Sequence, residues 1–416
     1  MKVKSERSVK RTGLDISFES LFVFCSALIF LGYFSYIGLR LCTPIDVPHF
    51  FPIAIDFAVF WSAGKLTLSG MAGEAYNVEA INRILVTIID HNPESLALPW
   101  FYPPPALLWF IPFALLSYKY AVVLWQGIGV ATYLYGIGKV NGRTVSAILL
   151  LGFPGFWMNL LWGNHAYVIT ALIALGYYNL RPRPIIAGGL FGLLCYKPHL
   201  AAVCLLTLLA AGRWKALFSA ALTILALIAT SFFLFPVAAW QGYIASMPRA
   251  VDYLLLSGWE NYPDIHVTVY TFMKLLGVTS GTAFVIQGLS AATVALVLAY
   301  FWNKAAFGNL TVAAVVPAIL LATPYALQYD LALLGLPLCI YFEEVSRNGW
   351  LFSGEKTLFF LCWLLPLYNW PLAHFTLVQP APVIVAAFLC AIVLRARIVH
   401  AFEQKPVASY YQHVLK

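Results

Sequence analysis

The chain has 416 residues, of which 62% are hydrophobic and only 10% are charged, and its mean hydropathy is +0.82. A soluble domain is nearer half apolar and a quarter charged, so this composition excludes an ordinary soluble enzyme and indicates an integral membrane protein. The net charge is +8, but the basic residues lie mainly at the ends of apolar runs. We therefore interpret them as topology signals and not as a nucleic-acid-binding patch.

Apolar runs of helix length recur along the whole chain. Lipid offers backbone groups no hydrogen-bond partners, which leaves helices or a closed barrel, and these runs are too long for barrel strands. We expect an all-α polytopic protein with one integral membrane domain over residues 1–416 and about twelve spans (range ten to twelve). The predicted runs are 18–42, 104–118, 120–138, 144–162, 166–180, 184–211, 214–236, 281–302, 309–323, 326–342, 357–371 and 376–394.

Both ends of the chain are basic. Residues 1–11 hold five Lys or Arg residues, and Arg395, Arg397 and Lys405 follow the last run. The positive-inside rule places both termini in the cytoplasm, and an even number of spans agrees with this. We expect a bacterial inner (plasma) membrane protein with its active site on the outer face.

Two polar stretches form the predicted outer loops. The first spans residues 43–102 and holds six acidic and two basic residues, and the second spans 237–280. Apolar residues fall on one helical face within 57–68, 78–88 and 267–276. This pattern predicts short amphipathic helices at the membrane surface.

Basic residues at 139–143 and 181–183 lie where simple alternation places the chain outside. Broken or re-entrant helices around Gly152–Tyr167 and Tyr196–His199 would reconcile the charges with the topology. Such breaks are tolerated where the backbone lines a cavity or is buried in protein.

Asp56 lies between Ile55 and Phe57 at the start of a predicted surface helix. An Asp there caps a helix by accepting backbone N–H bonds. It is also a candidate base that takes a proton from an incoming hydroxyl. The two roles are compatible.

Two further segments interrupt apolar sequence with polar groups. Tyr102 precedes three prolines, which are typical of a rigid helix start. Gly163 is followed by Asn164 and His165, which either bind a polar substrate or satisfy freed backbone groups. We name Tyr102, Asn164 and His165 as candidate substrate-binding residues.

Lys197, Pro198 and His199 lie deep inside the run 184–211. An ionisable group at membrane depth is costly and is a functional candidate by default. Lys197 suits an anionic ligand such as a phosphate, with His199 beside it, or it is the partner of an intramembrane carboxylate.

Tyr329 and Asp330 lie between two apolar runs, on the face predicted to be outside, and Asp264 and His266 lie in the second outer loop. Asp330 either pairs with Lys197 or holds a sugar hydroxyl. The predicted topology gathers these groups with Asp56 near one interface. This is the chemistry of an enzyme whose donor is a lipid-linked anion.

The sequence indicates no cofactor and no metal site. None of the seven cysteines forms a metal-binding pattern with Cys or His, and there is no Gly-rich phosphate loop. A divalent metal is left open.

Five segments in order resemble glycosyltransferase family 87. They are DFAVFWSAGKLTLSGMAGEAYN, FYPPPALLWFIPFALLSY, NLLWGNHAYVITALIALGYY, AGGLFGLLCYKPHLA and ATPYALQYDLALLGLPL, and they cover most of residues 50–340. Two departures occur, because Asn164 stands where the family has Gln, and Gln328-Tyr329-Asp330 stands where a Trp and a His are common.

The resemblance implies a GT-C-type bundle and transfer of a sugar, often mannose, from a polyprenyl-phosphate donor on the non-cytoplasmic face. It also implies that Asp56 is the catalytic base. Together with the residue chemistry this predicts an inverting hexosyltransferase that uses a glycan or glycolipid acceptor. Lys197 and His199 would bind the donor phosphate.

Two other classes of protein stay open at this point. A transporter or flippase of a lipid-linked saccharide would also use intramembrane charge, although the sequence lacks a clear internal repeat. The other class is a structural membrane subunit without chemistry.

Overall fold

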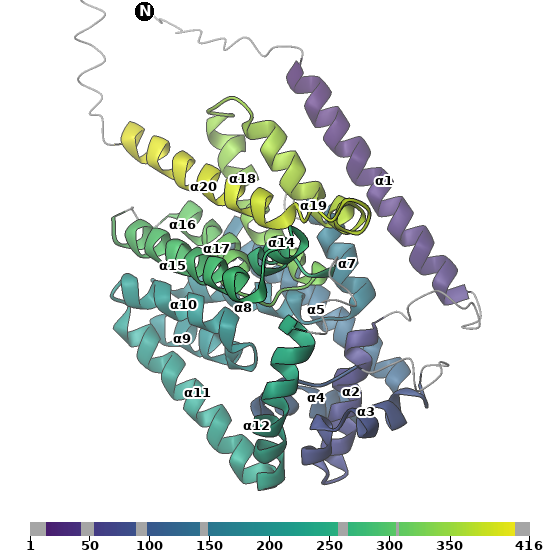
Figure 1. The fold of residues 1–416 in the computed structure, drawn as a ribbon. Coiled ribbons are helices and arrows are strands. Elements are labelled where there is room, and N and C mark those ends of the chain that lie inside the picture. The colour runs from purple at the N-terminus through teal and green to yellow at the C-terminus, as the bar shows by residue number, and fades with distance from the viewer. Residues whose placement is uncertain are drawn as a thin grey trace, which may run out of the picture.

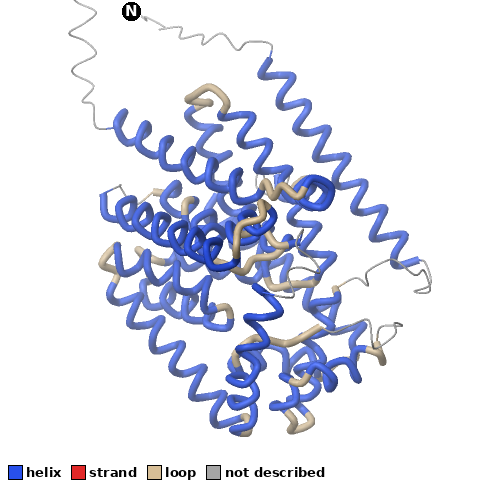
Figure 2. The backbone as a smooth tube through the Cα atoms, in the orientation of Figure 1, coloured by secondary structure: helices blue, strands red, loops and turns tan. Residues whose placement is uncertain are grey.

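The computed structural model describes residues 14–42, 54–88, 98–141, 149–256, 265–304 and 308–403. Within these ranges the chain is helical and forms no strand, as Figure 2 shows. One isolated bridge joins His266 to Leu327. The predicted all-α class is therefore confirmed for the described residues.

In the first half of the chain, one helix lies apart from the other elements. α1 lies along the outer edge of the molecule, and the later elements form the bundle (Figure 1). The elements are α1 (Leu14–Cys42), α2 (Ile55–Leu68), η1 (Ala72–Tyr76), α3 (Val78–Leu85), η3 (Pro104–Ala106), α4 (Leu107–Ala114), α5 (Tyr118–Asn141), α7 (Pro154–Trp162), α8 (Ala166–Asn179), α9 (Pro184–Gly192), η4 (Leu193–Tyr196) and α10 (Pro198–Ala210).

The second half completes the bundle. In the view of Figure 1, its last helices lie at the end of the molecule opposite to α2, α3 and α4. The elements are α11 (Trp214–Leu234), α12 (Val237–Val251), η5 (Asp252–Leu256), α14 (Val269–Leu275), α15 (Ser280–Lys304), α16 (Asn309–Ala313), α17 (Val315–Ala322), η7 (Gln328–Leu334), α18 (Gly335–Asn348), α19 (Glu355–Thr376) and α20 (Ala381–Glu403).

Five helices of the described residues are long and apolar enough to cross a membrane. They are Tyr118–Asn141, Trp214–Leu234, Ser280–Trp302, Glu355–Thr376 and Ala381–His400. Several shorter apolar helices, such as α8 and α10, pack among them. By length and composition these helices indicate a polytopic membrane protein, whereas the count of twelve spans stays a prediction.

Both predicted helix breaks occur. α7 ends at Gly163, whose φ of 71° lies in the left-handed region that favours glycine. A Cβ at Gly163 would also lie 2.6 Å from the Cβ of Ala54, so the start of α2 sits directly on this break. The second break is at Lys197, because Pro198 disfavours helical backbone in the residue before it and begins α10.

α2 differs from the predicted surface helix. Eleven of its fourteen residues are buried, so it is enclosed by protein and does not present one face to water. Gly64 lies on the same helical face as Phe57 and Trp61, and a Cβ there would lie 2.9 Å from the backbone oxygen of Phe110 on α4. This close approach buries both sides. α3 has the predicted amphipathic pattern, with Ala80, Ile81 and Leu85 buried, whereas its position at the membrane surface stays a prediction.

The predicted second outer loop, 237–280, contains α12, which packs on η1, and α14, which lies within the predicted helical piece 267–276. Its position outside the membrane stays a prediction. Another expectation from the apolar pattern is wrong. The run 326–342 is not one helix, because Gln328–Leu334 forms a 3-10 helix before α18 begins. Asp330 caps this 3-10 helix, since its Oδ2 accepts a hydrogen bond from the Leu327 N–H at 3.0 Å.

Arg395 is a buried part of the fold and does not belong to a charged tail. It lies within α20, and its Nη1 is 2.5 Å from Oε1 of Glu355, with both side chains fully buried. Its Nη2 donates to the backbone oxygens of Glu344 and Gly349. The pair therefore joins the end of α18 and the start of α19 to α20. The apolar run was predicted to end at residue 394, whereas the helix continues to Glu403.

The contact between α9 and α11 gives a stability prediction. A Cβ at Gly188 would collide with the backbone oxygen of Ala216, whereas a Cβ at Gly189 would meet only Oγ1 of Thr223 at 3.8 Å. We expect Gly188→Ala to lower the melting temperature of the purified protein in detergent, because overpacking costs about 1–3 kcal/mol. Gly189→Ala is the matched control and should leave it unchanged or raise it slightly. Equal melting temperatures for the two variants would show that α9 and α11 do not approach this closely at Gly188.

Candidate functional site

Four polar side chains from four separate segments form one hydrogen-bonded chain. Asn164, at the break between α7 and α8, donates from Nδ2 to Oδ2 of Asp56 at 2.7 Å. Lys197, at the break before α10, donates from Nζ to Oδ1 of Asn164 at 3.4 Å and to Oδ1 of Asp330 at 3.2 Å. The candidate residues predicted in separate segments therefore lie side by side.

Asn164 has one possible orientation in this chain. Its Oδ1 accepts from the backbone N–H of His165 at 2.7 Å as well as from the Lys197 ammonium. Both groups only donate, so the amide oxygen must face them and the amide NH₂ must face the Asp56 carboxylate. Asn164 thus fixes the position of Oδ2 of Asp56.

Asp56 is not the N-cap of α2. Ala54 occupies that position, and Asp56 lies in the first helical turn. The capping role is therefore wrong, and the carboxylate is directed to the side chain of Asn164. An acidic residue in the first turn is still favoured by the positive end of the helix dipole.

The surroundings of Asp56 make it a weak acid. α2 lies outside the five candidate spans, and burial raises the pKa of the Asp56 carboxyl to about 7. The nearby Asp330 raises the pKa as well, whereas the hydrogen bond from Asn164 and the charge of Lys197 lower it. A carboxylate with a pKa near neutrality is suited to proton transfer.

Lys197 and Asp330 form a buried ion pair. Lys197 is 2% exposed and Asp330 is 4% exposed. The Lys197 ammonium also lies 5.7 Å from the ring centroid of Tyr329. Of the two roles that the sequence left open for Lys197, the structure shows the pairing with an intramembrane carboxylate. Phosphate binding stays a prediction.

His165 lies in a cage of aromatic rings beside this chain. Its ring centroid is 4.1 Å from that of Phe60, 5.0 Å from that of Tyr102 and 5.2 Å from that of Tyr196. Phe110 and Trp125 complete the cage. Burial, and then the charge of Lys197, lower the pKa of His165 well below its ordinary value, so the ring is neutral.

The other two candidate histidines, His199 and His266, lie near the same tyrosine. The ring centroids of His199 and His266 each lie 6.2 Å from that of Tyr325. Asp264 lies outside the described residues. Within the described residues, no three His, Cys, Asp or Glu side chains come together in a group that would hold a metal ion.

Of the rings around His165, sequence reasoning named only Tyr102 as a site residue and missed Tyr196, Phe60, Phe110 and Trp125. An aromatic residue in an apolar run looks like core packing. For Tyr196 the only signal was its place directly before Lys197, at the predicted break.

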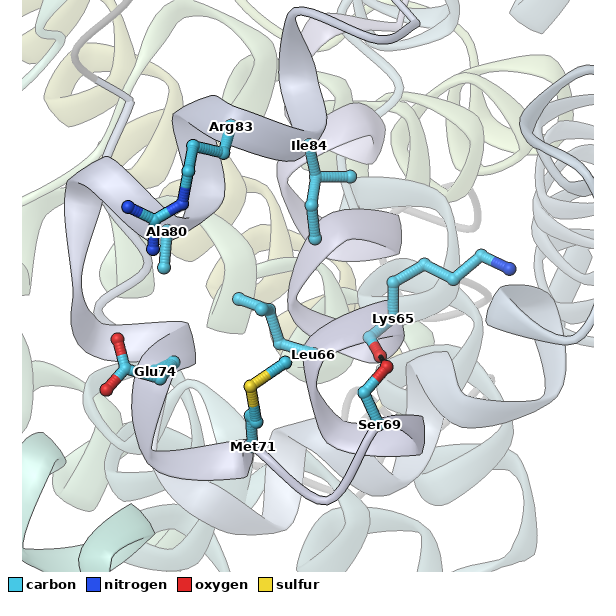
Figure 3. A pocket seen from close by; sticks show the side chains of 8 residues that line it. All are labelled: Lys65, Leu66, Ser69, Met71, Glu74, Ala80, Arg83 and Ile84. Atoms are coloured by element: carbon cyan, nitrogen blue, oxygen red, sulfur yellow. Dashed lines mark hydrogen bonds between the residues drawn. The ribbon is translucent and has the colours of Figure 1, made fainter.

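A cavity of about 520 Å³ lies at the other end of α2, between η1 and α3 (Figure 3). Lys65, Arg83 and Glu74 line it together with apolar side chains. In Figure 3 the Lys65 ammonium points away from the Arg83 guanidinium, which lies on the same side as the Glu74 carboxylate. The charged groups do not converge on one point, so we assign no ligand to this cavity.

Comparison with known proteins gives one match. The model of glycosyltransferase family 87 matches residues 100–324, which is more than half of the chain. No curated protein and no solved structure matches the chain. The matched range includes Tyr102, Asn164 and Lys197, whereas Asp56 and Asp330 lie outside it.

The Lys197–Asp330 pair gives a prediction on stability. Removing one partner of a buried pair leaves an uncompensated charge and costs about 3–5 kcal/mol. We expect Lys197→Met to lower the melting temperature strongly, and Lys197→Met combined with Asp330→Leu to recover part of the loss. Lys274→Met, at a lysine on α14 outside this chain of hydrogen bonds, is the control. A double variant as unstable as the sum of the two single variants would show that the residues are not coupled.

Proposed function

Because the chain belongs to glycosyltransferase family 87 and is a membrane glycosyltransferase, we propose that it transfers a hexose from a polyprenyl-phosphate donor. The acceptor is a hydroxyl of a glycan or glycolipid, and mannose is the first donor sugar to test. The reaction takes place on the non-cytoplasmic face of a bacterial inner membrane, with both termini in the cytoplasm. Family membership favours this enzyme over a flippase or a structural subunit.

The observation that carries the proposal is the setting of Asp56. One carboxylate oxygen is held by Asn164, and no other side chain of the described residues donates to this carboxylate. Asp56 is partly exposed, so its second oxygen is available to an acceptor hydroxyl. With its pKa near 7, the ionised form is populated at neutral pH and is basic enough to take the proton.

Lys197 supports binding of the donor phosphate. It precedes α10, a helix of thirteen residues, so the positive end of the helix dipole and a cation coincide. His199 follows in the first turn of α10 and is partly exposed. A bound phosphate would share the Lys197 ammonium with Asp330.

The transfer is a single displacement. Asp56 takes the proton of the acceptor hydroxyl, whose oxygen forms a bond to the anomeric carbon of the donor. The bond between this carbon and the phosphate oxygen breaks, and polyprenyl phosphate leaves with its electron pair. Attack opposite the leaving group inverts the anomeric centre, and Lys197 stabilises the charge that develops on the phosphate.

This mechanism predicts the effect of Asp56→Asn. The amide keeps the shape and the contact with Asn164 but cannot accept the proton, so transfer should fall by at least about 100-fold. The assay incubates the purified protein with polyprenyl-phosphate mannose, glucose and galactose and membrane glycolipids, and products are identified by mass spectrometry.

Glu79→Gln is the control, because Glu79 is an exposed acid on α3 in the same predicted loop. It should transfer at the wild-type rate. Near-normal transfer by Asp56→Asn would remove Asp56 from the role of base.

A further inference from the structure

Two buried polar atoms in the aromatic cage have no hydrogen-bond partner among the residues that the structure describes. They are Nε2 of His165 and the hydroxyl of Tyr196. His165 is 2% exposed and Tyr196 is 3% exposed. A buried polar group without a partner costs about 1–3 kcal/mol, so such groups call for a ligand or another explanation.

Asn164 determines which nitrogen of His165 is free. Nδ1 of His165 lies 3.2 Å from Oδ1 of Asn164, and this oxygen can only accept. In the neutral ring Nδ1 therefore carries the proton, and Nε2 is left with a lone pair. Nε2 thus requires a donor, such as a hydroxyl.

His165 and Tyr196 lie on the side of Asn164 where the phosphate of the sugar donor is proposed to bind. His165 and Lys197 both contact Oδ1 of Asn164, whereas Asp56 contacts Nδ2 at the other end of the amide. Tyr196 directly precedes Lys197 in the chain. A group bound between His165 and Tyr196 is therefore next to the proposed phosphate site.

We propose that Nε2 of His165 and the hydroxyl of Tyr196 bind hydroxyl groups of the donor sugar and select that sugar. This subsite rests on the proposed function. Aromatic walls with a few directed polar atoms are suited to a sugar ring, because its C–H faces pack on rings while its hydroxyls need partners. His165 accepts a hydrogen bond from one hydroxyl, and Tyr196 donates to or accepts from another.

Entry of the sugar requires Tyr102 to move. Of the five rings around His165, those of Phe60, Phe110, Trp125 and Tyr196 are buried, and only that of Tyr102 is partly exposed. Its backbone oxygen accepts a hydrogen bond from the Tyr76 hydroxyl at 2.9 Å, and three prolines follow it. The backbone is thus held, and the side chain is the part that can swing.

The test measures binding to the full chain in detergent. Polyprenyl phosphate and its mannosyl, glucosyl and galactosyl esters are titrated against the wild type, His165→Phe and Tyr196→Phe, with thermal stability as the readout. Phe keeps an aromatic ring at both positions and removes only the polar atoms. Tyr120→Phe, at an exposed tyrosine on α5, is the matched control.

The informative quantity is the Kd for the preferred hexosyl lipid divided by the Kd for polyprenyl phosphate. We expect each site variant to raise this ratio about tenfold, the effect of one lost hydrogen bond, and Tyr120→Phe to leave it unchanged.

If His165→Phe fails to fold, Tyr196→Phe alone decides the question. An unchanged ratio in the site variants would overturn the subsite, although the lipid phosphate still binds. Failure of the wild type to bind any of these lipids would overturn the proposed donor class, and the subsite with it.

Discussion

The site depends on one buried amide that joins a carboxylate to a cation. Asn164 donates to Asp56 and accepts from Lys197, although Asp56 lies 108 positions before it. Asn164 can do so because α7 stops at Gly163, which frees the next residues from helical geometry. The start of α2 contacts the same break, because the Ala54 N–H donates to the Leu161 oxygen at 2.6 Å. The break at Gly163 therefore both holds the start of α2 and positions Asn164 in the site.

The electrostatic balance of the site follows from this arrangement. Two carboxylates, Asp56 and Asp330, lie near the single ammonium of Lys197. Burial is the main cause of the raised pKa of Asp56, and the charge of Lys197, which is paired with Asp330, offsets only part of it. In the proposed reaction a donor phosphate adds another negative charge beside Lys197. Like charges favour the protonated form of a carboxyl, so donor binding would make Asp56 a stronger base.

The sequence predicted which residues form the site better than it predicted which of them contact one another. Lys197 and Asp56 stood out because charge is rare in such an apolar chain, and the breaks at Gly163 and Pro198 followed from local backbone rules. The pairing of Asn164 with Asp56 depends on tertiary packing, which spacing does not encode. The burial of α2 was missed because small residues such as Ala58 and Ala63 give no sign of a close helix contact. Tyr196 was missed because a buried aromatic residue in an apolar run is usually core.

The pH dependence of transfer in the wild type and in Asn164→Leu tests the central interaction most directly. The ionised form of Asp56 is the base, so the wild-type rate should rise with pH through about 7. The hydrogen bond from Asn164 lowers the pKa of Asp56. Its removal should therefore shift the midpoint of the rate profile to higher pH. A variant whose rate falls while its midpoint equals that of the wild type would show that Asn164 does not act on Asp56, and would contradict the account.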